Sequence, residues 1–517
     1  MSQQQRNDKK KGWAGLIILV LVLLAGAAYL RLQGSPDRVK PEKAGEQPES
    51  KQETPAREPV KVNAWLTTGD QKSLLAEQPP ITAGEQLSSA ATGQTTLIRV
   101  NPEVRYQTME GFGAAATGSS AYLINHKLSG PQRSALLKEL FTPAGINLSH
   151  LRHSIGASDY SVDDRGNPAS YTYDDVDSGT DYDLQHFSVE RDHDVITLLR
   201  DAILLHPGLR VTGTPWTAPP WMKFGEQIYN GWYLNYEDSR VYEAYARYFV
   251  RYIQAYEEQG VPVDAITLQN EPEFTTPDYP SMSMGAQEQA MFIRDYLGPA
   301  LKSSGLTVRI LAYDHNWDKG PAYVNQVLSS RETADQVAGT AYHCYAGNPQ
   351  VMSKVHEAYP DHSIHLTECS GGGWSPDFGD NLIWQMSNLI IDGTRNWAQS
   401  VQLWNLALDP DSGPVNGGCT NCRGVLTIDP DTGKITRNVE YYVLGHASKF
   451  IQAGAARVQS TSDVNGLKTA AFVNPDGEKV LIVLNRAASE RHLTVHSERD
   501  RFNYRLPARS VVTLTWP

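Results

Sequence analysis

Two short apolar runs in this chain of 517 residues each end on a glutamate. The first run, in AITLQNEPEF, ends on Asn270-Glu271, and the following Pro272 cannot continue a central strand because it has no backbone N–H. The second run, in SIHLTECSGGGW, ends on Glu368. Two carboxylates can hydrolyse a glycosidic bond, because one protonates the leaving oxygen while the other attacks the anomeric carbon or activates water. The two glutamates therefore predict glycoside chemistry, provided that the fold brings both strand ends together.

Other apolar runs also end on side chains that suit this chemistry. They are basic, acidic, amide-bearing or aromatic: Arg152, His153, Asp159, Trp216, Asp314, His315, Trp317, His343, Tyr345, Trp404 and Asn405. Tryptophan faces stack on the apolar faces of sugar rings, and Asn270 can donate a hydrogen bond to a 2-hydroxyl. The set includes no serine nucleophile elbow, no His-x-x-x-His metal pair and no Walker loop, which argues against those enzyme classes.

Each of these residues also has a purely structural interpretation. The tripeptide Asn-Glu-Pro is short enough to occur by chance in a chain of this length. Arg152 and Asp159 are equally compatible with an ion pair on the surface, and His343 with a hydrogen-bonded histidine inside the fold. The catalytic interpretation therefore depends on where the surrounding elements place these side chains.

Eight strand-like segments alternate with helix-like segments between about Thr108 and Thr427. The predicted strands are 108–114, 147–154, 209–216, 265–271, 308–314, 337–345, 363–368 and 400–408. Helical patterns cover 191–205, 239–259 and 380–394. This alternation is typical of a (β/α)8 barrel, whereas a doubly wound open sheet is disfavoured by the strand number and the missing Gly-rich phosphate loop.

In a (β/α)8 barrel the reactive groups lie at the carboxyl ends of the strands. Glu271 and Glu368 end the predicted fourth and seventh strands, Trp216 ends the third, and Trp404 lies in the eighth. The predicted architecture would therefore bring both carboxylates and both tryptophans to one face of the barrel.

A smaller β domain follows the barrel. Beyond the last barrel helix, 438–452, short strand-like runs alternate with turns such as Asn474-Pro475-Asp476-Gly477. Two similar runs, 60–68 and 95–101, precede the barrel. We predict an α/β protein in which a (β/α)8 TIM barrel, 105–452, carries a side β-sandwich built from 60–104 and 453–517.

The N-terminal sequence predicts a targeting element. A basic segment, 1–12, with Lys9, Lys10 and Lys11, precedes the uncharged apolar run 13–30, which is long enough to span a bilayer. We predict a transmembrane signal anchor or a cleavable signal peptide, followed by a disordered polar linker, 31–59. The membrane contact would be made by the N-terminal segment only. The protein would face the periplasm or the cell exterior, or be secreted if the signal is cleaved.

Composition narrows the possible partners. The net charge of −12 argues against a nucleic-acid partner, which would require a concentrated basic face, and it suits a neutral substrate. An exported chain permits disulfides. Cys419 and Cys422 are close enough in sequence for a local disulfide or free thiols, and the pairing of Cys344 and Cys369 stays open.

Six stretches of the chain resemble glycoside hydrolase family 30, which contains lysosomal-type glucosylceramidases and microbial β-1,6-glucanases. They are YQTMEGFGAAATGSSA, INLSHLRHSIGASDYS, TGTPWTAPPWMK, LQNEPEF, HLTECSGG and LWNLALDPDSGPVNGGCTNCRGVLTID. They extend from about Tyr106 to Asp429 and follow the order of the predicted strands. The resemblance implies a (β/α)8 barrel with a side β-sandwich, in agreement with the architecture inferred above.

The resemblance also implies roles for individual residues. Glu271 corresponds to the acid/base and Glu368 to the nucleophile. Asp159, Trp216, Asn270 and Trp404 correspond to residues that hold the sugar, and Tyr345 corresponds to a tyrosine near the nucleophile. We predict that these five residues and His343 bind the substrate. Tyr345 departs from the family pattern because it follows His343-Cys344 in place of a His-Trp pair. The loop with the GGCTNC insertion also differs from the lysosomal enzymes.

The implied mechanism is double displacement with retention of configuration, and it requires no metal and no cofactor. Retention goes with a carboxylate separation of about 5–5.5 Å, and inversion with about 6.5–9.5 Å. We expect Glu271 to carry the proton, because the negative charge of Glu368 raises the pKa of its neighbour.

The sequence thus predicts an O-glycosyl hydrolase that acts on glucosylceramide-type substrates or on β-1,6-glucan. Two alternatives stay open. One is a carbohydrate-binding envelope protein that has lost turnover, and the other is the same chemistry on a xyloside, fucoside or galactoside.

Overall fold

The computed structural model describes residues 60–84 and 95–517. The predicted basic segment 1–12, the signal segment 13–30 and the linker 31–59 lie outside the described residues. Among the helices of the described part, none is long and apolar enough to cross a membrane.

Eight parallel strands form a closed barrel, as predicted, in the order in which they occur along the chain. They are β4 (Gly111–Ala115), β5 (His150–Ile155), β6 (Arg210–Pro215), β7 (Ala265–Thr267), β8 (Arg309–Asn316), β9 (Gly339–His343), β10 (Ser363–Glu368) and β12 (Ala398–Leu403). The barrel closes where Val401 of β12 pairs with Phe112 of β4. Gly113 permits the close approach of β4 and β5, because a Cβ there would lie 1.6 Å from the carbonyl oxygen of His150.

Six of the barrel strands are shorter than predicted, and the differences at β7 and β12 affect the site. β7 ends at Thr267, so Asn270 and Glu271 lie in the loop that follows it, where Glu271 has a φ of 44°. The predicted strand 400–408 is divided into β12 and β13 (Ala407–Leu408), because Asn405 adopts a φ of 53° between them. Trp404 therefore follows the eighth barrel strand and is not part of it.

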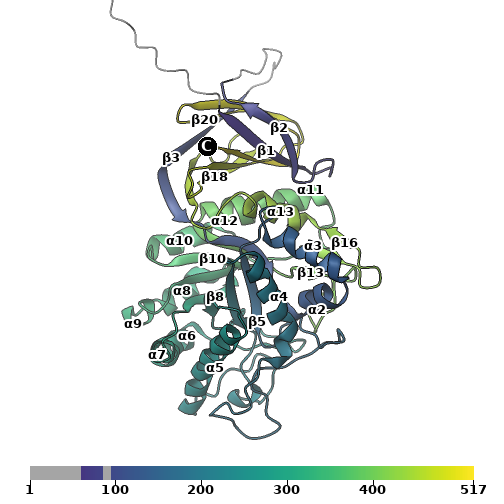
Figure 1. Ribbon diagram of the computed structural model, residues 1–517. Helices are drawn as coiled ribbons and strands as arrows, with labels where there is room; N and C mark the ends of the chain where they lie inside the picture. The colour runs from purple at the N-terminus through teal and green to yellow at the C-terminus, as the bar shows by residue number, and fades with distance from the viewer. Residues whose placement is uncertain (1–59, 85–94) are drawn as a thin grey trace, which may run out of the picture. The chain divides into compact units, whose positions relative to one another are not determined.

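Helices occupy the connections between the barrel strands and surround them (Figure 1). They are α2 (Gly118–His126), α3 (Gly130–Phe141), α4 (His193–Leu205), α5 (Ser239–Glu258), α6 (Ala286–Phe292), α7 (Gly298–Ser303), α8 (Gly320–Val327), α9 (Arg331–Ala334), α10 (Gln350–Ala358), α11 (Phe378–Gln385), α12 (Asp392–Arg395) and α13 (Val439–Ser448). Short 3₁₀ segments cover Glu190–Asp192 and Pro220–Met222. The predicted helix 380–394 is helical but contains a π segment, Met386–Ile391, between α11 and α12. A second π segment, Ile293–Leu297, joins α6 to α7.

The helix α5 shows why the sequence forms this layer. Its apolar residues recur every three or four positions, and Val241, Tyr245, Phe249 and Tyr252 are all buried against the barrel. The side chain of Asp238 caps the helix by accepting the backbone N–H of Arg240.

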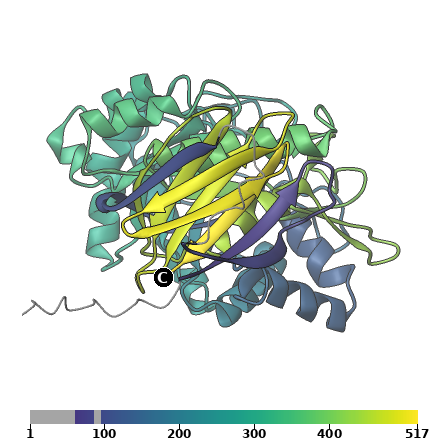
Figure 2. The ribbon, with the colours of Figure 1, turned by 90° about the horizontal axis from the view of Figure 1, so that it is seen from above.

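The second domain is a nine-stranded sheet with the order β2-β1-β22-β19-β18-β17-β3-β20-β21. Figure 2 shows its N-terminal strands in purple beside its C-terminal strands in yellow. The strands are β1 (Lys61–Thr68), β2 (Ala76–Thr82), β3 (Thr96–Thr108), β17 (Ala456–Ser460), β18 (Leu467–Val473), β19 (Lys479–Asn485), β20 (Arg491–Ser497), β21 (Asp500–Leu506) and β22 (Ser510–Trp516). Both ends of the described part therefore contribute strands, as predicted. β3 continues to Thr108, which pairs with Ala456, and so extends beyond the boundary expected at residue 104.

The sheet and the barrel share contacts. His446 of α13 is buried between Thr67 of β1, at 2.8 Å, and Thr513 of β22, at 2.9 Å. Ile482 and Val511 belong to the same apolar cluster as Leu444 of α13. One face of the sheet thus packs on the barrel, and the other has its own core around Leu481.

Small strands and two disulfides connect the loops beyond the barrel. β11 (Gly371–Gly372) pairs with β14 (Cys422–Arg423), while β13 (Ala407–Leu408) and β16 (Ile435–Arg437) flank β15 (Leu426–Ile428). Cys344 pairs with Cys369, and Cys419 pairs with Cys422. The first disulfide joins the residues that directly follow β9 and β10, which are the two strands that carry His343 and Glu368.

Candidate active site

A cavity of about 280 Å³ lies at the carboxyl ends of the barrel strands. Its lining consists of Asp159, Trp216, Asn270, Glu271, Tyr279, Tyr345, Glu368, Trp374, Trp404, Cys419 and Cys422. The fold therefore brings together all of the sequence-predicted site residues except His343, which lies behind the cavity wall and contacts Glu271.

The two carboxylates face each other across the cavity. Glu368 is the last residue of β10, and Glu271 lies in the loop after β7. The left-handed backbone of Glu271 is held by its N–H, which donates to the carbonyl oxygen of Asp314 at 3.0 Å. One carboxylate oxygen of each glutamate and a ring nitrogen of His343 all lie within 4.8 Å of one another. This short separation matches the retaining geometry and leaves too little room for the water that an inverting enzyme places between its carboxylates.

Both oxygens of Glu368 are held by donors. Arg152 donates from Nη1 to Oε2 at 2.5 Å, and the hydroxyl of Tyr345 donates to Oε1 at 2.8 Å. The other terminal nitrogen of Arg152 donates to Asn270 at 2.8 Å and to Asp314 at 3.0 Å. Arg152 therefore fixes the positions of Glu368 and Asn270 together. The alternative of a surface ion pair with Asp159 is wrong, because Arg152 is fully buried.

Asp314 is an anion at the centre of the site that sequence reasoning placed at a strand end without assigning it a role. It accepts hydrogen bonds from Arg152, His343, Thr267 and Thr367. Burial favours its neutral form, but the charges of Arg152 and His343 outweigh burial and hold its pKa well below the usual range. Asp314 adopts a φ of 72° at an irregular pairing of β8 with β9, and this local distortion is not readable from the sequence.

His343 connects Asp314 to Glu271. Its Nε2 lies 3.1 Å from Asp314 Oδ1, and its Nδ1 lies 3.0 Å from Glu271 Oε1. Burial disfavours the charged imidazolium, but Glu368 and Asp314 outweigh burial and raise the pKa of His343 to about 9. A histidine that was predicted to bind the sugar thus lies where it controls the protonation of a carboxylate.

Glu271 has a lowered pKa, contrary to the sequence-based expectation. Burial raises this pKa, yet the hydrogen bond and the charge of His343 lower it by more, with a further contribution from His315. A cation that the sequence did not position therefore lowers the pKa of Glu271. Because the Nδ1–Oε1 contact is a hydrogen bond, one proton can be held by Glu271 and His343 as a pair.

The cavity walls combine aromatic rings with a carboxyl group that has one unpartnered oxygen. Trp216 and Trp404 stack with centroids 5.1 Å apart, and the guanidinium of Arg152 lies 5.0 Å from the ring centre of Trp216. Oδ1 of Asp159 is buried without a hydrogen-bond partner among the described residues. Burial and the charge of Glu368 raise the pKa of Asp159 well above its usual value. An unpartnered carboxyl oxygen beside stacked indoles is suited to a sugar hydroxyl.

Four lining residues were not assigned to the site from the sequence: Tyr279, Trp374, Cys419 and Cys422. Three of them come from loops, and Cys422 begins the two-residue strand β14, so neither strand nor helix periodicity indicates which way these side chains point. The GGGW sequence contains a usable signal, because a Cβ on Gly372 would lie 2.0 Å from the ring of Trp374. The glycine is thus required by the position of the indole.

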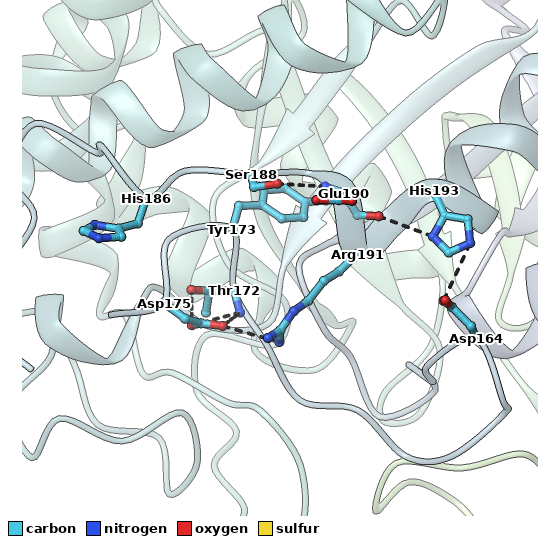
Figure 3. Close-up of a pocket in the computed structure, with 9 residues that line it drawn as sticks. All are labelled: Asp164, Thr172, Tyr173, Asp175, His186, Ser188, Glu190, Arg191 and His193. Carbon is cyan, nitrogen blue, oxygen red and sulfur yellow. Dashed lines mark hydrogen bonds and ion pairs between the residues drawn. The ribbon is translucent and has the colours of Figure 1, made fainter. Parts of the chain in front are cut away.

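A second hollow in the described surface, of about 410 Å³, has a different character (Figure 3). Most of its polar side chains bond to one another or to neighbouring groups, as His186 does to Asp181 at 2.8 Å. Asp175 accepts the hydroxyl of Thr172 and pairs with Arg191 at 3.7 Å, while His193 lies 3.6 Å from Asp164. This hollow has no facing pair of glutamates and no exposed tyrosine or tryptophan ring. We therefore assign the chemistry to the cavity between Glu271 and Glu368.

Removing the buried guanidinium should be strongly destabilising. We expect Arg152→Met to lower the free energy of unfolding by about 3–5 kcal/mol, because it leaves the charges of Asp314 and Glu368 uncompensated. Denaturant unfolding measures the change. Arg210→Met is a matched control, because Arg210 pairs with Asp264 in a partly exposed position and should cost only about 0–1 kcal/mol. Equal costs for the two variants would contradict the central role of Arg152.

Models of two domains of one protein family match the chain. The glycosyl hydrolase family 30 TIM-barrel domain matches residues 109–451, and the glycosyl hydrolase family 30 beta sandwich domain matches residues 454–514. The first match spans the closed barrel, and the second spans most of β17 to β22.

Named relatives and solved structures extend this similarity over most of the chain. The endo-1,6-beta-D-glucanase BGN16.3 of Trichoderma harzianum is 37% identical over 432 residues, which is 80% of this chain and 84% of the relative. The lysosomal acid glucosylceramidase of Mus musculus is 29% identical over 453 residues, covering 82% and 84% of the two chains. The solved structure of the endo-beta1,6-glucanase BT3312 has a TM-score of 0.79 at 31% identity, with coverage of 88% and 99%.

Proposed function

The chain belongs to glycoside hydrolase family 30, and on that premise we propose that Glu368 is its nucleophile, Glu271 its acid/base and β-1,6-glucan its substrate. The chain is a retaining β-glycoside hydrolase, in keeping with its relatives. The separation of at most 4.8 Å between an oxygen of Glu271 and an oxygen of Glu368 supports the retaining mechanism. The observation that carries the assignment of roles is the difference in their partners: Arg152 and Tyr345 donate to Glu368, whereas His343 shares a hydrogen bond with Glu271.

In the first step, Glu368 attacks the anomeric carbon, and the bond from that carbon to the leaving oxygen breaks. The proton shared by Glu271 and His343 passes to the leaving oxygen, and a glycosyl ester forms on Glu368. Arg152 and Tyr345 hold the carboxylate in position for this attack. In the second step, Glu271 takes a proton from water, the resulting hydroxide attacks the anomeric carbon, and Glu368 leaves as a carboxylate.

The cavity residues that take no part in the bond changes are proposed to position the sugar. Asn270, held by Arg152, lies beside the acid/base and is proposed to bind the 2-hydroxyl. Asp159, Trp216 and Trp404 are proposed to bind the remaining hydroxyls and one face of the ring. We assign His343 to positioning of the proton and not to contact with the sugar, because it lies behind Glu271.

Similarity favours β-1,6-glucan over a glucosyl lipid. The fungal relative named for endo-1,6-β-glucanase activity is 37% identical, and the mammalian glucosylceramidase is 29% identical. Product analysis of the purified full chain on linear β-1,6-glucan tests the proposal. Gentio-oligosaccharides of mixed size, absent with Glu368→Gln, are the expected products. Turnover of glucosylceramide or a xyloside with none of the glucan would replace the proposed substrate.

The alternative of a carbohydrate-binding protein without turnover is tested by the same variant. An enzyme loses product formation when Glu368 becomes glutamine, whereas a binding protein would form no product in either version and would retain its affinity. The presence of both glutamates within 4.8 Å, with Arg152 and Tyr345 bound to Glu368, favours the enzyme.

We propose that the protein is exported. Its two disulfides suit an oxidising compartment. The apolar run 13–30 is proposed as a signal anchor or cleaved signal peptide, so that the barrel faces the periplasm or the cell exterior. Protease accessibility in spheroplasts, from which the outer barrier has been removed, checks this: a barrel that stays protected until the spheroplasts are lysed would exclude export.

The pH dependence of activity should report the proton shared by His343 and Glu271. We expect kcat/KM to fall as the pH rises through about 9, the pKa of His343, because the pair then loses the proton that the leaving group needs. In His343→Gln the alkaline limb should move toward neutral pH, because Glu271 must hold the proton alone. His365→Gln is the control: burial lowers the pKa of His365 to about 4, so it is neutral throughout this range. An unmoved limb in His343→Gln would contradict proton sharing.

The same pKa shift predicts a stability effect of defined sign. The folded pKa of His343 lies above the ordinary value of 6.5, so its charge stabilises the fold fully below pH 6.5. That contribution disappears as the pH rises through about 9. The melting temperature of the wild type should therefore fall more between pH 6.5 and 9 than that of His343→Gln.

A further inference from the structure

Exposed aromatic side chains concentrate on the loops at the carboxyl ends of the barrel strands. In the described residues, seven aromatic side chains are exposed, and six of them lie on these loops with exposures of 39–62%. They are Trp232, Tyr233, Tyr236, Phe274, Tyr345 and Trp374. The seventh, Trp384, is on α11. Tyr345 and Trp374 already line the catalytic cavity, which leaves the other four without a function.

Three of these rings form one cluster with Phe224 on the loop after β6. We call Phe224, Trp232, Tyr233 and Tyr236 the β6 platform. Phe224 contacts Tyr236 at 4.9 Å and Tyr233 at 5.5 Å between ring centres, and the planes of Tyr233 and Tyr236 are 18° apart. The rings thus support one another while large parts of their surfaces stay in contact with solvent.

The backbone fixes the β6 platform in place. Lys223 bridges Leu234, and the N–H of Phe224 donates to the carbonyl oxygen of Tyr233 at 3.1 Å. Gly225 has a φ of 80°, and a Cβ there would lie 2.8 Å from the ring of Trp232. The backbone of the loop thus forms a defined turn that holds these rings at the surface.

The platform loop is bonded to the wall of the catalytic cavity. Asn230 donates to Thr276 at 2.8 Å, and Ser281 donates to the carbonyl oxygen of Ile228 at 3.1 Å. The segment 276–283 includes Tyr279, which lines the cavity and stacks on Phe274 with ring centres 6.4 Å apart. Aromatic surface therefore continues from the cavity, through Tyr279 and Phe274, toward the β6 platform.

The chemistry of this surface favours a sugar chain over a lipid. Its exposed large apolar side chains are all aromatic, and two of the platform residues are tyrosines, whose rings stack on sugars while their hydroxyls stay hydrated. A surface that binds anionic membrane would also carry exposed lysine or arginine beside its apolar side chains. On loops 216–238 and 271–285 the sole cation, Lys223, is buried and bonded to Thr217, whereas Glu226, Glu237 and Glu273 are exposed.

We propose that the β6 platform is a distal subsite that binds glucosyl units of a β-glucan chain beyond the units held in the catalytic cavity. This inference rests on the proposed function, because it assigns the outer glucosyl units of the proposed polymer substrate to this surface. The platform adds affinity for long chains and contributes nothing to a substrate that fills the cavity alone.

Chain-length dependence tests the subsite. Tyr233→Ala/Tyr236→Ala and Trp232→Ala are compared with the wild type on gentio-oligosaccharides of increasing length, on an aryl β-glucoside and on glucosylceramide micelles. We expect kcat/KM on the longest chains to fall about tenfold, as the loss of one ring–sugar contact implies, mainly through KM. Aryl β-glucoside turnover should stay within twofold, and Trp384→Ala should change neither.

The outcomes separate the subsite from the proposed function. Equal loss on long and short substrates, or no loss on long ones, would overturn the subsite. A loss confined to glucosylceramide micelles would also overturn it and assign the surface to lipid. If the wild type cleaves the aryl β-glucoside but no β-1,6-glucan, the proposed substrate fails before any variant is compared. Titration of gentio-oligosaccharides into Glu368→Gln, with and without the platform substitutions, measures directly how much the platform contributes to the affinity for the chain.

Discussion

Replacing Glu368 by glutamine is expected to lower kcat on every β-glucoside by about 10⁴- to 10⁶-fold, the range found when the nucleophile of a covalent mechanism is removed. Glutamine has nearly the same shape as glutamate, but its amide cannot form the glycosyl ester. The loss should be independent of the leaving group, because no intermediate forms even on an activated aryl β-glucoside. Initial rates on β-1,6-glucan and on an aryl β-glucoside give the two values to be compared.

Two controls distinguish lost chemistry from a damaged fold. Glu273→Gln is the matched substitution on the same face, because Glu273 is exposed two residues beyond Glu271, and it should retain activity within a fewfold range. A 2-deoxy-2-fluoro-β-glucoside should label the wild type on the peptide that contains Glu368 and should leave Glu368→Gln unlabelled. Turnover by Glu368→Gln within tenfold of the wild type, or a label on another residue, would remove Glu368 from the nucleophile role.

The barrel was predictable because each strand repeats one simple pattern. An apolar run such as 363–368 is buried on both faces, ends on a polar residue and is followed by a helical period, and eight such units close on themselves. The residues at which the strands end were harder to predict. Glu271 and Asn405 both adopt positive φ just where the sequence suggested continued strand, and side-chain alternation does not report such a change in the backbone.

The candidate site was predictable in its membership but not in its electrostatics. Both glutamates, the two stacked tryptophans, Asn270 and Asp159 lie at or within a few residues of the carboxyl ends of barrel strands, so the barrel topology brings them together. The partners of Arg152 come from the loop after β7, from β8 and from β10, and such a contact set depends on the assembled barrel. The pKa of Glu271 was expected in the wrong direction for the same reason, because a cation from β9 determines it.

The disulfide between Cys344 and Cys369 illustrates the same limit. Each cysteine directly follows a residue of the site, so its neighbourhood was evident from the sequence. Its partner depends on register: β9 and β10 align His343 with Glu368, which makes the next residues of the two strands neighbours. Register between parallel strands joined by a helix is set by packing, and a single sequence contains no direct signal for it.

Replacing Glu271 by glutamine should give a loss that depends on the leaving group, and this dependence identifies an acid/base. On β-1,6-glucan the leaving sugar hydroxyl needs a proton, so we expect kcat/KM to fall by about 10²- to 10⁴-fold. On an aryl β-glucoside with a good leaving group the first step needs no acid, so kcat/KM should change little. The second step still lacks its base, so the glycosyl ester on Glu368 should accumulate and both kcat and KM should fall.

Added azide should restore much of the kcat of Glu271→Gln on the aryl substrate, because the anion attacks the glycosyl ester without a general base and yields a β-glucosyl azide. The retained configuration of that product follows from two inversions, the first by Glu368 and the second by azide. His343 is the competing proton donor, because its Nδ1 lies 3.0 Å from Glu271 Oε1 in the wild type. If His343 alone supplied the proton, Glu271→Gln would keep its activity on β-1,6-glucan. Equal losses on the glucan and the aryl substrate, with no effect of azide, would instead make Glu271 a positioning residue and leave the acid to be found elsewhere in the cavity.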